Sequence, residues 1–180
     1  MESDESLYAR VKHGDLLAFD ELYTRYASRL FGFLRAQLPA SSDAEDVFHE
    51  TMMATLESDE VTFEAASFRT WLFRIARNRV LNRLRSSARG EAAKLRLSAG
   101  GEPAAPSAED RVARAQMVDA LERAVKRLPS TLSDVYHLRS SGLSYEEMAA
   151  VLEIPLGTIK SRMNQMVKVL REELEPWIAR

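Results

Sequence analysis

Apolar residues in the first half of the chain recur every three to five positions, which is the spacing of helices that each bury one face. Three such stripes follow one another: Phe19 to Leu38, Val47 to Leu56, and Phe68 to Leu84. Ser42 and Glu45 have the spacing of a capping box, so we expect the second helix to begin there. No stretch alternates with the period of two that strands require. The fold class is therefore predicted to be all-α.

The pattern breaks near residue 86 and resumes near residue 112. Between them, residues 98–107 are small, polar and interrupted by glycine and proline, as in flexible linkers. Helical spacing returns from Val118 to Leu128 and from Leu132 to Arg139, with Gly142 suited to end the second of these helices. We therefore predict two small helical domains, 1–88 and 112–180, joined by a flexible linker at 89–111.

A helix-turn-helix is predicted near the C-terminus. Ser144 and Glu147 form a second capping box, and a short break at residues 153–155 separates that helix from the next. The second helix has an apolar stripe of Ile159, Met163 and Met166. Its other side carries residues able to pair with base edges in a major groove, namely Thr158, Lys160, Ser161, Arg162, Asn164 and Gln165. The same pattern also fits an ordinary helical hairpin with a solvated face.

Charge is divided unevenly although the chain as a whole carries only −2. Residues 40–66 hold eight acidic and no Lys or Arg residues, whereas residues 67–96 hold nine basic residues and one acidic residue. Such a division suggests two adjacent surfaces for partners of opposite sign. Alternatively, the two runs neutralise each other inside one domain.

Several protein classes are disfavoured by what the sequence lacks. There is no cysteine, the three histidines are far apart, and no phosphate-binding loop or nucleophile elbow occurs. We therefore expect no enzyme, cofactor, metal site or small-molecule substrate. The absence of a long apolar run and the acidic N-terminus argue against a membrane span or signal peptide, so a cytoplasmic location is expected.

The C-terminal sequence resembles region 4 of extracytoplasmic-function (ECF) sigma factors. The similarity covers Leu128-Pro129, residues 142–149 and residues 154–162, although response-regulator output domains share part of it. Three earlier segments, residues 19–26, 43–51 and 68–78, look like successive parts of sigma region 2. The resemblance thus spans nearly the whole chain, with the region 2 bundle first and the region 4 helix-turn-helix last.

This resemblance implies a function and partners: a subunit that binds core RNA polymerase, recognises the −10 and −35 elements of promoter DNA, and stabilises the melted strand. Core binding would fall to Asp43, Asp46, His49 and Glu50. The −10 element would be held and read by Arg69, Trp71, Phe73, Arg74, Arg77, Asn78 and Asn82. The −35 element would be read by the six residues of the second helix-turn-helix helix. An aromatic such as Trp71, at helical spacing beside Leu72, is more often a core residue.

Two departures from the family pattern are visible. Relatives often carry a basic run where this chain has residues 164–167, and often a tryptophan near residues 54–57. The family also works commonly under an anti-sigma factor, although no residue here identifies one. The competing interpretation is an autonomous helix-turn-helix regulator, which would bind duplex DNA alone and usually as a dimer.

Overall fold

Helices make up all the regular structure in the residues that the computed structural model describes, which are 2–58, 63, 67–91 and 108–178. The prediction of an all-α fold is confirmed. The helices are α1 (Asp4–Lys12), α2 (Leu16–Gln37), α3 (Ser41–Glu57), α4 (Phe68–Glu91), α5 (Ala108–Lys126), α6 (Ser130–Ser140), α7 (Tyr145–Leu152) and α8 (Leu156–Ile178).

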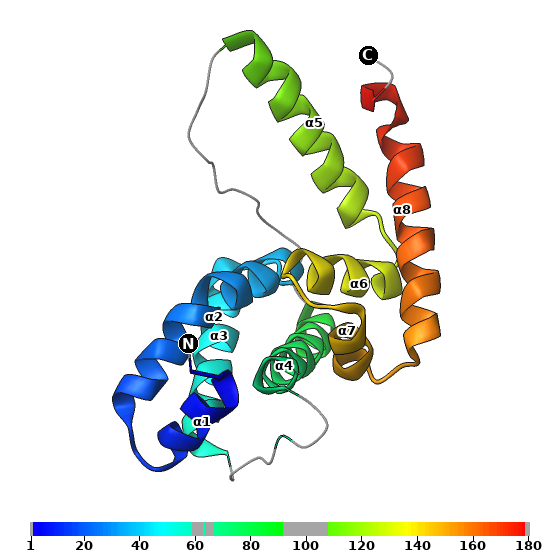
Figure 1. Cartoon of the computed structure of the whole chain (residues 1–180). Helices are drawn as coiled ribbons and strands as arrows, with labels where there is room; N and C mark the ends of the chain where they lie inside the picture. The colour runs from blue at the N-terminus through cyan, green and yellow to red at the C-terminus, as the bar shows by residue number, and fades with distance from the viewer. Residues whose placement is uncertain (1, 59–62, 64–66, 92–107, 179–180) are drawn as a thin grey trace.

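Helices α1 to α4 form the first module. Its second helix begins because Asp15 accepts hydrogen bonds from the backbone N–H groups of Leu17 and Ala18. The apolar stripe of α2 is buried as expected, with Leu22 and Leu30 fully enclosed. Helix α2 packs on α1, α3 and α4, and α3 packs on α4. The packing of these four helices thus fixes where α3 and α4 lie in the module (Figure 1).

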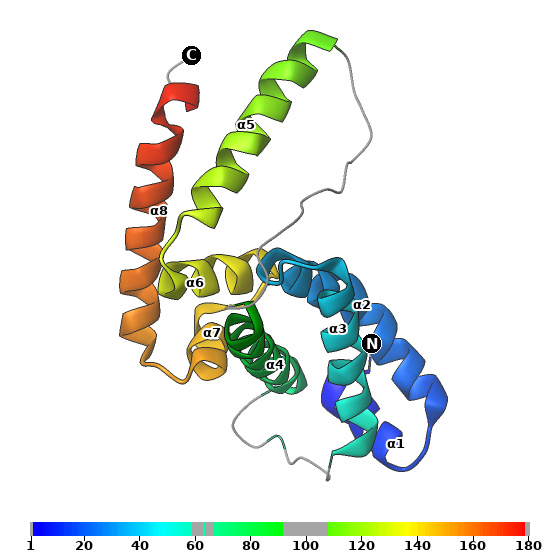
Figure 2. The same ribbon diagram turned by 180° about the vertical axis from the view of Figure 1, so that it is seen from behind.

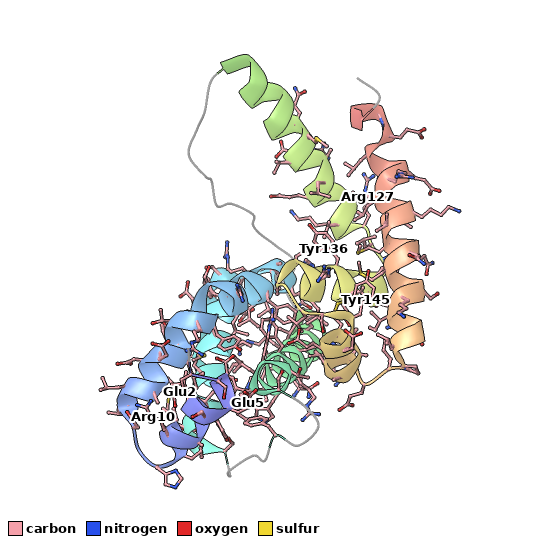
Figure 3. The ribbon with its side chains drawn as sticks, viewed as in Figure 1. Glu2, Glu5, Arg10, Arg127, Tyr136 and Tyr145 are labelled. Atoms are coloured by element: carbon pink, nitrogen blue, oxygen red, sulfur yellow. The ribbon has the colours of Figure 1, made fainter. Side chains whose placement is uncertain are left out.

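Helix α1 was not foreseen from the sequence. Its buried residues, Leu7, Tyr8 and Val11, are too few to give a clear stripe. Tyr8 nevertheless enters an aromatic cluster with Phe68 and Trp71, at ring-centroid distances of 5.5 and 5.4 Å. Figure 3 shows the labelled Glu2, Glu5 and Arg10 at this end of the module, where Glu5 accepts a hydrogen bond from the backbone N–H of Phe68. The first turn of α1 therefore helps to fix the start of α4.

The two predicted capping boxes have different outcomes. At α7, Glu147 N–H donates to Ser144 Oγ and Ser144 N–H donates to Glu147 Oε2, so this box is confirmed. At α3 the prediction is wrong, because the helix already includes Ser41 and its N-cap, Ala40, offers no side-chain hydrogen bond. Ser42 therefore lies inside the helix, and the Glu45 carboxylate instead accepts from the hydroxyl of Ser41.

The second module consists of α5 to α8, and α7 and α8 form the predicted helix-turn-helix. Glu153 ends α7 in the left-handed conformation, with φ of 55°, and Gly142 precedes α7 with φ of 84°. Both turns are therefore tight. Helix α8 also packs along α5 and α6, and Figure 3 labels Arg127 at the α5–α6 junction beside α8. Arg127 pairs with Glu173 of α8 at 3.4 Å.

The two modules lie against each other, a contact that the sequence did not predict. Helix α4 packs on α7 and α2 packs on α6, as the two opposite views agree (Figures 1 and 2). Their buried apolar residues belong to one continuous core. Of the predicted linker, residues 89–91 continue α4 and residues 108–111 begin α5, while residues 92–107 lie outside the described residues. None of the described helices is long and apolar enough to span a membrane.

Candidate nucleic-acid and polymerase surfaces

Helix α8 presents a polar outer face opposite a buried apolar stripe. Ile159, Met163 and Met166 are buried beneath it. Lys160, Ser161, Asn164 and Gln165 are exposed, and Thr158 and Arg162 lie half-buried at the edges. The structure therefore brings all six residues predicted for this helix onto one side of it. Amide, hydroxyl and cationic groups on one exposed helix are suited to contact base edges in a major groove.

An acidic row runs along α3 toward α4. Arg83 of α4 bridges two of its members, Asp43 at 3.1 Å and Asp46 at 2.5 Å, and Arg79 pairs with Glu50 at 2.8 Å. The second interpretation of the divided charge is thus what the structure shows for these residues: the acidic and basic runs partly neutralise each other within one module.

The pairing leaves much of the acidic row accessible. The side chains of Asp46 and Glu50 are 62% and 52% exposed, and His49 is exposed as well. Surface ion pairs of this kind contribute little to stability, typically about 0–1 kcal/mol each. The α3 surface made by Asp43, Asp46, His49 and Glu50 therefore remains available to a basic partner.

A second row of arginines on α4 faces the other module. Arg77 pairs with Asp134 of α6 at 2.8 Å, and Arg69 approaches Glu147 of α7 at 3.6 Å. Arg69 also donates to the backbone carbonyl of Ser141 at 3.2 Å. Arg74 lies 3.8 Å from Glu153. These three arginines, predicted to hold the −10 strand, are therefore occupied by the second module.

The aromatic residues of α4 are core residues. Phe73 is fully buried and packs edge-on against Phe33 at 5.4 Å, and Trp71 is 7% exposed in the aromatic cluster with Tyr8. Neither ring offers a face on which a base could stack in this arrangement. Asn78 and Asn82, by contrast, are exposed. Trp71 is therefore a core residue in this structure, as its helical spacing beside Leu72 indicated, and Phe73 is a core residue as well.

Residues 22–90 match the family described as Sigma-70 region 2, and residues 119–169 match Sigma-70, region 4. The RNA polymerase sigma-H factor of Pseudomonas aeruginosa is 30% identical over 97% of this chain and 95% of its own length. The ECF RNA polymerase sigma-E factor of Salmonella typhimurium is 29% identical over 99% of this chain and 97% of its own length. The chain belongs to the sigma-70 family and is an ECF-type sigma factor.

A solved structure supports the same assignment. The sigma factor RpoE of Bartonella quintana, in a co-crystal structure with the anti-sigma factor NepR, is similar with a TM-score of 0.67. The two are 25% identical, and the similarity covers 87% of this chain and 96% of that one. Sigma factors are transcription initiation factors that associate with RNA polymerase, so the features of this chain that bear on function are its binding surfaces. The described residues contain no cluster of His, Asp or Glu that could hold a metal ion.

Sequence reasoning missed the acidic residues that face α4. Asp134, Glu147 and Glu153 were not candidates, because each lies more than fifty positions from its arginine and sits in a different helical pattern. One signal was available: Asp134 interrupts the buried stripe of α6 between Leu132 and Val135. A carboxylate that is half-buried in this way needs a cationic partner.

His137 lies on the same helix, α6, and is 8% exposed. Burial lowers the pKa of the His137 imidazole below its ordinary value, although the nearby Asp134 carboxylate acts in the opposite direction. The neutral ring is therefore favoured in the folded sigma factor. Its backbone carbonyl accepts hydrogen bonds from both the N–H and the hydroxyl of Ser141, which helps to fix the turn before α7.

Proposed function

We propose that this sigma factor divides promoter-specific initiation among three helices: α3 binds core RNA polymerase, α4 holds and reads the −10 element, and α8 reads the −35 element. The observation that carries the proposal is the position of the two family matches. Region 2 coincides with the first module and region 4 with the second, and each module exposes polar residues on the helix to which a role is assigned.

The assignment of α3 rests on charge and exposure. Asp46 and Glu50 stand on the outer side of the helix, where an arginine-bearing partner could replace their contacts with Arg83 and Arg79. Complementary charge at an interface speeds association and selects the partner. Asp43 and His49 complete this surface at its start and centre.

The assignment of α4 rests on arginine and asparagine side chains alone. Arg69, Arg74 and Arg77 supply charge for phosphates, and exposed Asn78 and Asn82 supply amides for the edges of unstacked bases. Stacking by Trp71 and Phe73 is not included, because both rings are buried. Holding and reading would then be done by different residues of one helix.

The assignment of α8 rests on its outer face. Asn164 and Gln165 stand where relatives often carry basic residues, so fewer charges are available there to anchor phosphates. We therefore propose that −35 recognition depends more on amide contacts with bases than on phosphate anchoring. Thr158, Lys160, Ser161 and Arg162 surround these two amides.

Further properties follow from the proposed role. The chain would act as a binding subunit without a catalytic group, cofactor or small-molecule substrate, and in the cytoplasm, where RNA polymerase works. The similarity to a sigma factor crystallised with an anti-sigma factor supports an anti-sigma factor as a regulator here too.

The proposal can be tested by assembly with core RNA polymerase. Purified chain should retain core polymerase in a pull-down, and the assembled enzyme should initiate on a subset of a genomic promoter pool. Asp46→Arg should weaken core affinity by about tenfold or more, because like charges across an interface cost several kcal/mol. The helix content measured by circular dichroism should not change.

Asp119→Arg is the matched control, since Asp119 is exposed on α5, makes no ion pair with the described residues, and undergoes the same change of charge. It should leave core affinity unchanged. Tight, specific binding of promoter duplex by the free chain, with no retention of core polymerase, would instead identify an autonomous regulator.

A further inference from the structure

Helix α1 lies before the part of the chain that matches Sigma-70 region 2, which begins at residue 22. It nevertheless contacts every other helix of the first module. Only three of its residues are buried. Several of its polar side chains reach to other helices instead, and Figure 3 labels Glu5 among them. These polar contacts distinguish α1 from a helix that only adds apolar surface to the bundle.

Glu5 holds the start of α4. Its Oε1 accepts a hydrogen bond from the backbone N–H of Phe68, the first residue of α4, at 3.0 Å. This N–H lies in the first turn, where the helix itself supplies no acceptor. The Glu5 carboxylate also places a negative charge at the end of α4 where the helix dipole favours one. A side chain 63 positions away in the chain therefore fixes where α4 begins.

Lys12 holds the end of α3 with the opposite charge. Its Nζ donates to the backbone carbonyl oxygens of Leu56 at 2.8 Å and of Ser58 at 2.5 Å. The last carbonyls of a helix have no partner within it, and a cation near them is favourable. Tyr8 adds a second contact there, because its hydroxyl lies 3.3 Å from Ser58 Oγ. Helix α1 thus meets α3 where it ends and α4 where it begins.

The ring of Tyr8 packs between these two contacts. It lies against Phe63, Phe68 and Trp71, at ring-centroid distances of 5.2, 5.5 and 5.4 Å. Inclined aromatic pairs at such distances are more favourable than their buried area alone would make them. Phe63 belongs to the connection between α3 and α4. Helix α1 therefore contacts this connection at its start, at Phe63 and at its end.

Helix α1 is itself fixed to α2. Asp4 accepts hydrogen bonds from Arg25 Nη1, at 2.6 Å, and from the hydroxyl of Tyr26. Tyr26 is buried and the side chain of Arg25 is only 18% exposed. Charged contacts that are shielded in this way are screened less by salt than contacts at the surface. The contacts of Glu5 and Lys12 are thus made from a helix that α2 keeps in one place.

We propose that α1 is a positioning element for promoter recognition, in which Glu5 fixes the start of α4 and Lys12 fixes the end of α3. The inference rests on the proposed roles of α3 in core binding and of α4 at the −10 element. Helix α4 is continuous from Phe68, so a change in its first turn is carried to Asn78, about 15 Å further along the axis. Hydrogen bonds weaken steeply when donor and acceptor are misaligned. Reading of the −10 element therefore depends on α1, without α1 itself touching DNA.

The positioning role can be tested with holoenzyme assembled from core polymerase and the full-length chain. Glu5→Ala removes the acceptor of the Phe68 N–H. Glu5→Gln keeps an acceptor oxygen and should behave as the parent chain does. Glu2→Ala is the matched control, because the Glu2 carboxylate accepts hydrogen bonds from Ser6 and Arg10, which both belong to α1.

Initiation is measured on the promoter that the parent holoenzyme selects and on variants changed at single base pairs. Glu5→Ala should lower the preference for the parent base at one or more −10 positions by about fivefold or more, which is the discrimination that one well-placed contact provides. Preference at the −35 element and affinity for core polymerase should be unchanged, because α8 and the acidic surface of α3 keep their positions. Glu2→Ala and Glu5→Gln should match the parent in all three measurements.

Hydrogen exchange in the free chain tests the same contact without polymerase. Glu5→Ala should speed exchange of the Phe68 and Trp71 amides and leave α2 as protected as in the parent chain. Lys12→Met keeps a side chain of similar length but removes its charge, so it should speed exchange at the end of α3 and alter −10 preference as well. It replaces Glu5→Ala if that variant does not fold.

Two results would overturn the inference. One is unchanged exchange of the Phe68 amide in Glu5→Ala. The other is a Glu5→Ala holoenzyme with the base preferences of Glu2→Ala, including one that loses core affinity and initiates less on every promoter alike, as a merely unstable chain would. Failure of the parent chain to retain core polymerase rejects the sigma role instead, and the exchange experiment then decides alone whether α1 holds α4.

Discussion

Helices α4 and α8 both carry polar residues that we propose to contact promoter DNA, yet the surroundings of these residues differ. Five arginines of α4 pair with carboxylates of the same chain: two with α3 (Arg79 and Arg83), and three with α6, with α7 or with the residue that ends α7 (Arg69, Arg74 and Arg77). On α8, Lys160, Ser161, Asn164 and Gln165 face solvent. The arginines of α4 are thus paired within the chain, whereas the polar face of α8 is open to solvent.

The chemistry of the side chains explains the difference. A guanidinium offers five donors and attracts any carboxylate within reach, so a row of arginines is readily neutralised by its own chain. An amide has both donor and acceptor groups and no charge, and water satisfies it well. A surface that recognises bases through amides can therefore stay exposed to solvent. A surface that holds phosphates through arginines instead tends to form ion pairs with carboxylates of its own chain.

The largest expected effect concerns the aromatic residues of α4. Phe73→Ala should lower the free energy of unfolding by about 3–5 kcal/mol, because it leaves a cavity beside Phe33. Chemical denaturation measures this, and Phe73→Leu should cost less than about 1.5 kcal/mol. A Phe73→Ala protein of normal stability that fails to hold melted DNA would show instead that the ring leaves the core to meet a base.

A second prediction concerns reading by α8. Asn164→Ala should weaken binding by about 1–3 kcal/mol at one −35 position and little at others, because a bidentate amide contact is lost. Abortive initiation on promoter variants, each changed at one base pair, measures the effect. The fold should be unchanged, since Asn164 is exposed. An equal loss at every position would make Asn164 a phosphate contact and would remove the contrast with α4.

A third prediction tests the start of α7, on which both the contact with α4 and the placement of α8 depend. Ser144→Ala should cost about 1 kcal/mol of stability, because the N–H of Glu147 loses its acceptor. Ser42→Ala is the matched control. Ser42 lies inside α3, where alanine is the better helix former, so its replacement should be neutral or slightly stabilising in the same denaturation experiment.

The smallest expected effect is a dependence of stability on pH that is largest in α6, the helix that carries His137. Burial holds the pKa of His137 below its ordinary value of 6.5, so the folded chain keeps the ring neutral while the unfolded chain takes up a proton. The neutral ring therefore contributes to the free energy of unfolding above about pH 6.5, and this contribution is lost as the pH falls below that value. Hydrogen exchange of α6, compared with α2, measures the loss.

His137→Asn should remove this dependence, whereas His49→Asn, on the exposed side of α3, should retain it. If the unsubstituted chain and both variants lost the same protection of α6 from hydrogen exchange, the effect would come from carboxylates and not from His137.

Local signals in the sequence predicted the local structure well. The stripe of Ile159, Met163 and Met166 and the box of Ser144 and Glu147 depend on neighbours three or four positions away, and both are confirmed. The same reasoning failed at Ser42, because the N-cap of α3 is Ala40, two residues earlier, and offers no side-chain hydrogen bond. It failed at α1 because a short helix that buries only three residues leaves a weak pattern.

The contact between the modules could not be predicted in that way. Arg69 and Ser141 are 72 positions apart, and nothing in the spacing of either segment refers to the other. The divided charge of residues 40–96 left two interpretations open, and neutralisation inside one domain was only the alternative to two partner surfaces. It did not show that Arg79 and Arg83 would turn to α3 while Arg69, Arg74 and Arg77 turn to α6 and α7.

The Arg77–Asp134 pair also links the stabilities of the two modules. A contact between groups on two helices couples the equilibria in which each helix takes part, and such coupling acts equally in both directions. A substitution that loosens α6 in the second module should therefore also be felt at α4 in the first, and the reverse should hold to the same extent.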